Sequence, residues 1–311
     1  MKRTLHCLTI AAVLGLSSGT GSARAAELPL RVVTLSTVLT EIAREVGGDQ
    51  VVVTGLLQPG VDPHSFEPSP ADMRAVVAAE VVFASGLNLE SYLDRLVANS
   101  RPGGIVVSVG DALPRPLAMT APSDLVAGTS GADHAPFRRE LDPHWWHSIE
   151  NVRVAAGLVR DHYKLLRPAG ADIFERKARA YLDRLSALQA WVADEMSQLP
   201  PARRQLVTSH DAFGYFARDY GFTIHAISGP STDGEPNARH LAALIDLIRR
   251  EHIPAVFAES STNPQLMANL VAETGVRLGG TLYADGLGLG AASTYEGMYR
   301  HNVTVVVEAL R

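Results

Sequence analysis

From residue 30 onward, short runs of β-branched and other apolar residues alternate with longer amphipathic stretches. In the first half, the expected strands lie at 31–35, 50–56, 81–84 and 104–107, and the expected helices at 38–46, 70–79 and 89–97. The second half repeats this order, with strands at 205–209, 223–227, 255–258 and 276–282, and helices at 212–220, 237–251, 264–274 and 295–310. Such alternation is typical of parallel sheets flanked by helices. The pattern therefore predicts an α/β protein with two lobes.

A single long helix is expected between the lobes. Residues 171–199 contain no glycine or proline and carry apolar residues at helical spacing, and Pro168 and Pro200 lie just outside this stretch. At 1.5 Å per residue, such a helix is about 40 Å long. We expect an N-terminal lobe at 26–168, a linking helix at 169–200 and a C-terminal lobe at 201–311. A coiled-coil dimer arm is the alternative, although fewer than five heptads are present.

Two further segments stand apart from this pattern. At the N-terminus, Lys2 and Arg3 precede an apolar run at 8–16 that ends in small residues up to Ala23-Arg24-Ala25. This arrangement predicts a cleavable secretory signal peptide at 1–25, too short to span a bilayer. The stretch 113–141 contains four prolines and little periodicity, and it is longer than most connecting loops. We expect it to be functional or disordered.

Charge and cysteine content narrow the functional classes. Removal of residues 1–25 leaves 25 basic and 33 acidic residues, a net charge of −8, with no basic stripe. Nucleic acid is therefore not an expected partner. The only cysteine, Cys7, precedes the apolar run, which disfavours a lipoprotein anchor and leaves the mature chain without thiolates. Any metal site must be built from histidine and carboxylate.

Two histidines occur in a repeated Asp-Pro-His tripeptide. His64 lies in a loop that three prolines keep extended, although a surface histidine in a turn is the alternative there. Before His144, Asp142 is typical of an N-cap and Pro143 of the first helical position, which predicts His144 in the first turn of a helix. His147 lies one turn further on and is a less favoured ligand than His144.

The second lobe offers two more candidates. His210 and Asp285 each follow an expected strand, and in open α/β sheets ligands bind where strands end. If the lobes face one another, these residues meet His64 and His144 in the cleft. Three imidazoles and one carboxylate suit tetrahedral Zn²⁺, whereas Mn²⁺ would more naturally take extra oxygen. Four protein ligands leave no open position, which favours carriage of the ion over hydrolysis.

Weaker candidates leave alternatives open. Glu259 ends an expected strand at the same edge and is either a partner that orients a ligand or a helix cap. His134, in the long loop, is either a transient metal contact or a solvated side chain. An exported metallohydrolase with Glu259 or Asp211 as general base remains a rival hypothesis. A surface protein in which the metal only joins the lobes is another.

The segments 60–73, 142–146, 208–221 and 283–288 together resemble the metal-binding solute-binding proteins of bacterial ABC transporters for zinc and manganese, the cluster A-I family. The resemblance covers nearly the whole mature chain. It implies two sandwich lobes joined by a long helix, with one ion held between them and passed to a membrane permease. It also implies that the ligands are His64, His144, His210 and Asp285, and that the protein is not an enzyme.

The resemblance also bears on the choice of metal. Manganese members typically have Glu at the position of His210, so the chain is more similar to the zinc members. Zinc members often carry a His- and acid-rich loop before the second ligand, whereas here that region has only His134. The run Trp145-Trp146-His147 is closest to a zinc subgroup in which some members receive the ion from a periplasmic metallochaperone. We therefore expect a periplasmic, monomeric Zn²⁺ carrier that serves an ABC permease.

Overall fold

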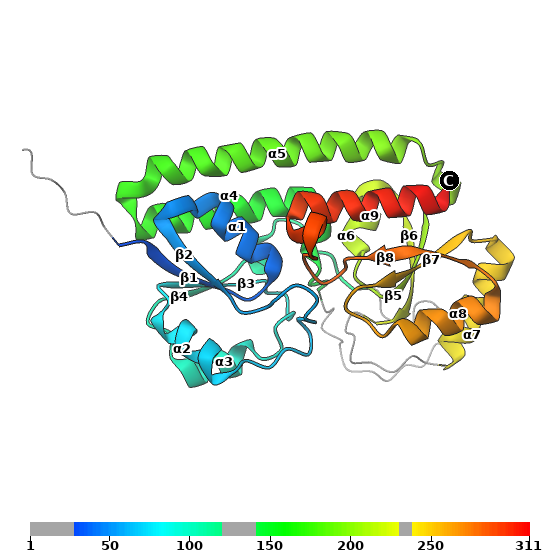
Figure 1. Cartoon of the computed structure of the whole chain (residues 1–311), viewed down its shortest axis with the longest axis horizontal. Coiled ribbons are helices and arrows are strands. Elements are labelled where there is room, and N and C mark those ends of the chain that lie inside the picture. Colours follow the sequence, from blue (N-terminus) through cyan, green and yellow to red (C-terminus); the bar gives the residue numbers. More distant parts are fainter. Residues whose placement is uncertain (1–27, 120–140, 230–237) are drawn as a thin grey trace, which may run out of the picture.

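The computed structural model describes residues 28–119, 141–229 and 238–311. Figure 1 shows two α/β lobes side by side, with one long helix running along both of them. The expected signal peptide and His134 lie outside the described residues. Within those residues, no helix combines the length and apolar character needed to cross a membrane.

The N-terminal lobe is built on a four-stranded parallel sheet with the order β2-β1-β3-β4. The strands are β1 (Leu30–Thr34), β2 (Val51–Gly55), β3 (Val81–Ala84) and β4 (Ile105–Ser108). Because successive side chains of a strand point to opposite faces, Val32 packs towards α1 (Thr37–Gly47) and α4 (Ile149–Leu166), whereas Val33 packs towards α2 (Pro70–Ala78) and α3 (Leu93–Ser100). Helices therefore cover both faces of this sheet.

The C-terminal lobe contains two parallel strand pairs, β5 with β6 and β7 with β8, and β5 lies beside β7. The strands are β5 (Gln205–His210), β6 (Thr223–Ser228), β7 (Ala255–Glu259) and β8 (Arg277–Leu282). The helices are α6 (Gly214–Tyr220), α7 (Ala238–Glu251), α8 (Pro264–Thr274) and α9 (Tyr295–Leu310). Val207 and Val256 pack with residues of α7 and α8, whereas Leu206 and Phe257 pack on the side of α9. This lobe too has helices on both faces.

The linking helix α5 (Ala171–Ser197) confirms the long helix expected from the sequence. One stripe of it is buried, consisting of Phe174, Ala178, Tyr181, Leu185, Leu188, Val192 and Met196. This stripe packs on α1 and α4 of the first lobe and on α9 of the second, within one continuous apolar core. The apolar face of α5 is thus covered by its own chain, which argues against a coiled-coil arm.

Two predictions of helix starts are wrong. Helix α3 begins at Leu93 rather than near residue 89, because Leu87 and Asn88 adopt positive φ angles of 53° and 66° and hold this stretch in a turn. No α-helix begins at Pro143. A short 3₁₀ helix, Trp145–His147, follows His144, and α4 begins at Ile149. The physical reason is that the Asp142 carboxylate accepts from the backbone and the ring of His144 instead of capping a longer helix.

Candidate metal centre

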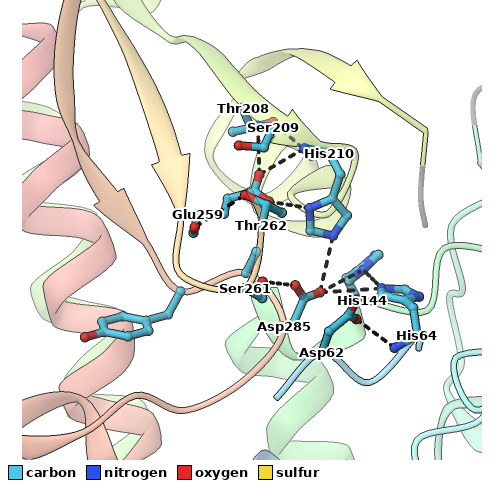
Figure 2. A network of polar contacts seen from close by, with 12 residues as sticks. Asp62, His64, His144, Thr208, Ser209, His210, Glu259, Ser261, Thr262 and Asp285 are labelled. Atoms are coloured by element: carbon cyan, nitrogen blue, oxygen red, sulfur yellow. Dashed lines mark hydrogen bonds and ion pairs between the residues drawn. The ribbon is translucent and has the colours of Figure 1, made fainter. Parts of the chain in front are cut away.

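His64, His144, His210 and Asp285 converge between the lobes from four different segments, as Figure 2 shows. His64 lies in the loop between β2 and α2, and His144 immediately precedes the 3₁₀ helix. His210 is the last residue of β5, and Asp285 lies in the turn after β8. One potential ligand atom from each of these residues lies within 4.8 Å of all the others. Each lobe therefore supplies two of the four side chains.

A single carboxylate oxygen, Oδ1 of Asp285, faces the Nε2 atoms of all three histidines. It lies 3.5 Å from Nε2 of His64, 3.6 Å from that of His144 and 3.2 Å from that of His210. Both Asp285 Oδ1 and His210 Nε2 are buried without a hydrogen bond in the described part of the chain. A buried polar atom without a partner costs about 1–3 kcal/mol. A dication bound among these atoms would remove that cost, so the donor set fits a metal ion.

The other ring nitrogens of two histidines contact carboxylates. Nδ1 of His144 lies 2.9 Å from Asp142 Oδ1, and Nδ1 of His210 donates to Oε2 of Glu259. Such contacts place the proton on Nδ1 and leave the lone pair of Nε2 for an ion. Asp142 and Glu259 thus orient the two rings.

The charges of the site are strongly coupled. Burial lowers the pKa of His210, but the nearby Glu259 and Asp285 carboxylates outweigh it and raise this pKa well above its usual value. Burial likewise raises the pKa of Asp285, but the positive charge of His210 and the proximity of the three imidazoles reverse the direction and hold it well below its usual range. Binding of a cation to His210 is therefore in competition with a proton.

His147 lies outside this group of four. Its Nε2 donates to the carbonyl oxygen of Ala284 at 2.8 Å, and its ring packs on Phe213 with centroids 4.4 Å apart. Burial lowers the pKa of His147 to about 4, so the ring is neutral near pH 7 and its single proton is used in this bond. Nε1 of Trp146 donates to the same carbonyl at 2.9 Å. The two side chains therefore hold the residue that precedes Asp285.

Glu259 contacts more than the His210 ring. Its Oε1 also accepts from the backbone amides of Ser209 and His210, at 3.0 and 3.1 Å. Glu259 does not cap the next helix, because Asn263 fills that position in α8. Glu259 therefore contacts the ring of a candidate ligand and does not take the capping role that was the alternative.

Sequence reasoning missed two contributors, Ser261 and the carboxylate function of Asp142. The Ser261 hydroxyl donates to Oδ2 of Asp285. Asp142 accepts from the backbone amide of His144 at 2.9 Å, and Asp62 accepts from that of His64 at 2.8 Å. The repeated Asp-Pro-His tripeptide was the available signal for the second case, because aspartate commonly bonds the amide two residues further on. No comparable signal marked Ser261.

A small hollow leads from the surface to Asp285. Its lining comes from both lobes and includes Thr37, Gln58, Gly60, Val61, Ser261 and Asp285. The lobes are also bonded beside it, where the Leu287 amide donates to the Thr37 hydroxyl at 2.8 Å. Gly286, with a φ of 153°, permits this approach, because a Cβ there would lie 2.4 Å from the Thr37 hydroxyl oxygen. The four side chains are thus buried but close to solvent.

Comparisons with known proteins agree with this architecture and site. Residues 32–309 match the family model described as zinc-uptake complex component A, periplasmic. The manganese-binding lipoprotein MntA of Bacillus subtilis is 33% identical over 320 residues, covering 100% of both chains. The zinc-binding protein TroA of Treponema pallidum is 32% identical over 299 residues, covering 94% of this chain and 92% of TroA.

Solved structures show the same fold. The periplasmic zinc-binding protein TroA from Treponema pallidum superimposes with a TM-score of 0.80 at 30% identity, covering 91% of this chain and 99% of TroA. The Mn-bound periplasmic metal-binding protein from Candidatus Liberibacter asiaticus gives 0.77 at 25% identity, covering 90% and 99%.

Two lobes that share a buried histidine and carboxylate cluster, joined by one long helix, define a solute-binding protein for a metal ion. The chain belongs to the family of metal-binding solute-binding proteins of bacterial ABC transporters. Members of this family are transport proteins that work with a permease rather than enzymes. The relatives named above include both zinc- and manganese-binding proteins, so membership alone does not assign the ion.

Proposed function

We propose that this protein captures Zn²⁺ with His64, His144, His210 and Asp285 and delivers it to an ABC permease. The observation that carries the proposal is the arrangement of three Nε2 atoms around one buried carboxylate oxygen that has no hydrogen bond within the described residues. Three nitrogens and one oxygen complete a tetrahedral zinc shell. Because no position is left for a reactive water, the arrangement supports carriage rather than hydrolysis.

The balance of ligand types supports zinc over manganese. Mn²⁺ prefers carboxylate, carbonyl and water oxygens, whereas imidazole suits Zn²⁺. The manganese-binding names of some relatives make Mn²⁺ the alternative cargo, and the experiment below includes it. Cu²⁺ is expected to bind tightly in vitro whatever the cargo is, because of the Irving–Williams order. Selectivity is therefore best judged between Zn²⁺ and Mn²⁺.

The test is a metal titration of the apo protein in competition with a chelator. We expect one Zn²⁺ per chain and a much lower affinity for Mn²⁺. Each of the variants His64→Ala, His144→Ala, His210→Ala and Asp285→Ala should bind Zn²⁺ far more weakly. His147→Ala should retain binding better than His144→Ala. Tighter binding of Mn²⁺ than of Zn²⁺ would contradict the zinc assignment, and retained affinity in all four variants would contradict the site.

Location and partners form part of the same proposal. We propose that residues 1–25 are removed as a signal peptide and that the mature chain acts as a monomer in the periplasm. Relatives named as lipoproteins point to the alternative of a lipid on Cys7. Mass spectrometry of the mature N-terminus separates the two, because cleavage after Ala25 removes Cys7 from the protein. Donation of Zn²⁺ by a periplasmic metallochaperone is a further proposal, which a transfer assay with the purified partner would test.

A further inference from the structure

The two carboxylate oxygens of Asp285 have different partners. Oδ1 faces the Nε2 atoms of the three histidines. Oδ2 accepts a hydrogen bond from the hydroxyl of Ser261, which Figure 2 shows on the side of the carboxylate away from the histidine rings. One oxygen is therefore directed at the proposed ion position, and the other is directed at Ser261.

The Ser261 hydroxyl is held in place by the turn that follows β7. The backbone amide of Ser260 donates to the Leu282 carbonyl at 3.0 Å, and the Thr262 hydroxyl donates to the Glu259 carbonyl at 3.3 Å. Leu282 is the last residue of β8, three positions before Asp285. The turn that carries Ser261 is thus tied to the strand that carries Asp285. Their hydrogen bond does not depend on a bound ion.

The direction of Oδ2 affects how many donors an ion can receive. With one oxygen of Asp285 and three imidazole nitrogens, an ion has four protein donors, the number that Zn²⁺ prefers. If Oδ2 were free to rotate towards the ion, the carboxylate would supply a second oxygen and a fifth donor. Mn²⁺ benefits from additional oxygen, because its preferred shells are oxygen-rich and larger. The hydrogen bond from Ser261 holds Oδ2 turned away from the ion position and therefore acts against Mn²⁺.

We propose that Ser261 is a specificity-determining residue, which keeps Asp285 a single-oxygen ligand and so favours Zn²⁺ over Mn²⁺. This inference rests on the proposed function, since it concerns the same four ligands. It adds a residue that does not itself contact the ion. It also gives the zinc preference a second physical cause besides the three imidazoles.

The test compares three variants of the full mature protein with wild type. Ser261→Ala removes the hydroxyl, and Ser261→Thr keeps it. Ser260→Ala is the matched control, because this neighbouring serine is exposed and its hydroxyl has no hydrogen bond within the described residues. The dissociation constants for Zn²⁺ and Mn²⁺ are measured by chelator competition. The visible absorption of the Co²⁺-loaded proteins reports coordination number, because four-coordinate Co²⁺ absorbs more strongly than five- or six-coordinate Co²⁺.

For Ser261→Ala we expect the Kd for Zn²⁺ to rise by about tenfold, the lower end of the range for loss of a group that supports a ligand. The Kd for Mn²⁺ should stay unchanged or fall, and the Co²⁺ bands should weaken. Ser261→Thr and Ser260→Ala should match wild type in both respects. Thermal unfolding of the apo proteins checks that Ser261→Ala still folds, and the Co²⁺ spectrum reports on the site independently of stability.

Three outcomes would overturn the inference. These are an unchanged ratio of the two dissociation constants in Ser261→Ala, an unchanged Co²⁺ spectrum, and an equal change in Ser260→Ala. Failure of the proposed function would look different, because wild type itself would then bind no Zn²⁺ or would prefer Mn²⁺. The wild-type titration therefore separates the two failures.

Discussion

Each lobe contains a buried glutamate that accepts hydrogen bonds from two successive backbone amides at the end of a strand. In the N-terminal lobe, Glu90 accepts from Ser85 at 2.7 Å and from Gly86 at 3.1 Å, just after β3. In the C-terminal lobe, Glu259 accepts from Ser209 and His210 at the end of β5. Both residues are 4% exposed. The same type of hydrogen bonding therefore occurs at the end of a strand in both lobes.

The two glutamates differ in what else they touch. Oε2 of Glu259 also contacts Nδ1 of His210, so the C-terminal glutamate orients a proposed ligand. Both oxygens of Glu90 accept hydrogen bonds from backbone amides instead. The orienting carboxylate of the N-terminal lobe is Asp142, two residues from His144 in the same loop. The comparison suggests that one type of buried carboxylate stabilises the fold in the first lobe and tunes the metal site in the second.

The largest expected effect concerns folding and comes from Glu90. Burial raises its pKa to about 7 from 4.5, so the folded protein holds this proton more tightly than the unfolded chain. Its contribution to stability is therefore greatest below about pH 4.5 and falls by about 3 kcal/mol as the pH rises past 7. Glu90→Gln should reduce the change in the free energy of unfolding between these pH values by about the same amount. Denaturant unfolding of the apo protein between about pH 5 and about pH 8 measures it.

Glu41 provides an internal check on this prediction. Glu41 of α1 is half-buried beside the start of α9, where its carboxylate accepts from the Tyr295 amide, and its desolvation raises its pKa to about 7 as well. Glu41→Gln should further reduce the pH dependence of the free energy of unfolding. The double variant should depend less on pH than either single variant. If the free energy of unfolding of Glu90→Gln depends on pH as strongly as that of wild type, the Glu90 carboxyl is already ionised in the folded state near pH 5. The raised pKa of Glu90 would then be wrong.

The second prediction contrasts the two glutamates in metal binding. Glu259→Gln should raise the Kd for Zn²⁺ by about tenfold to a hundredfold, because the neutral amide no longer fixes the His210 ring or favours its Nδ1 proton. Glu90→Gln should leave the Kd close to wild type, since Glu90 contacts no proposed ligand. Both values come from the same chelator competition. Equal losses in the two variants would show that Glu259 acts only through the stability of its lobe.

The sequence was sufficient to predict the fold class and to propose the four ligands. The alternation of strands and helices is a local signal, and His210 and Asp285 stand where β5 and β8 end, which a linear pattern reveals. The long helix α5 was recognisable because a stretch without glycine or proline needs no tertiary information. Local and periodic features were therefore the reliable ones.

What the sequence could not supply depends on contacts between distant segments. The contact of His210 with Glu259 spans 49 positions, and the bond from His147 to the Ala284 carbonyl spans 137. Nothing near His147 in the chain indicates that its proton is used there rather than its lone pair. The 3₁₀ helix after His144 was missed for a related reason, because an aspartate before Pro-His fits both an N-cap and a ring-orienting turn.

The third prediction compares the adjacent tryptophans between the lobes. Nε1 of Trp145 donates at 3.1 Å to the Ser85 carbonyl in its own lobe, whereas Nε1 of Trp146 donates to the Ala284 carbonyl beside Asp285. Trp146→Phe should raise the Kd for Zn²⁺ roughly fivefold, the value of about one hydrogen bond. Trp145→Phe, which removes a similar bond from a similarly buried ring, should change Kd less.

A double-mutant cycle makes this prediction specific to Asp285. In an Asp285→Ala background, Trp146→Phe should have no further effect on Zn²⁺ binding, because the residue it positions is gone. An effect that persists in that background would assign Trp146 to general packing. The apo unfolding temperatures of the two tryptophan variants should be lowered alike, since both lose buried aromatic volume.

The smallest expected effect is on overall shape, because the differences between the lobes concern side chains rather than their relative position. Arg184 of α5 bridges Glu45 of α1 and Glu296 of α9, at 2.7 Å each, and the core beneath α5 is continuous across both lobes. A hinge closure would have to break these contacts. We expect solution scattering to give the same radius of gyration with and without Zn²⁺. A large compaction on adding the ion would mean that α5 bends. The release of Zn²⁺ would then involve movement of a whole lobe rather than of the loops that carry His64 and Asp285.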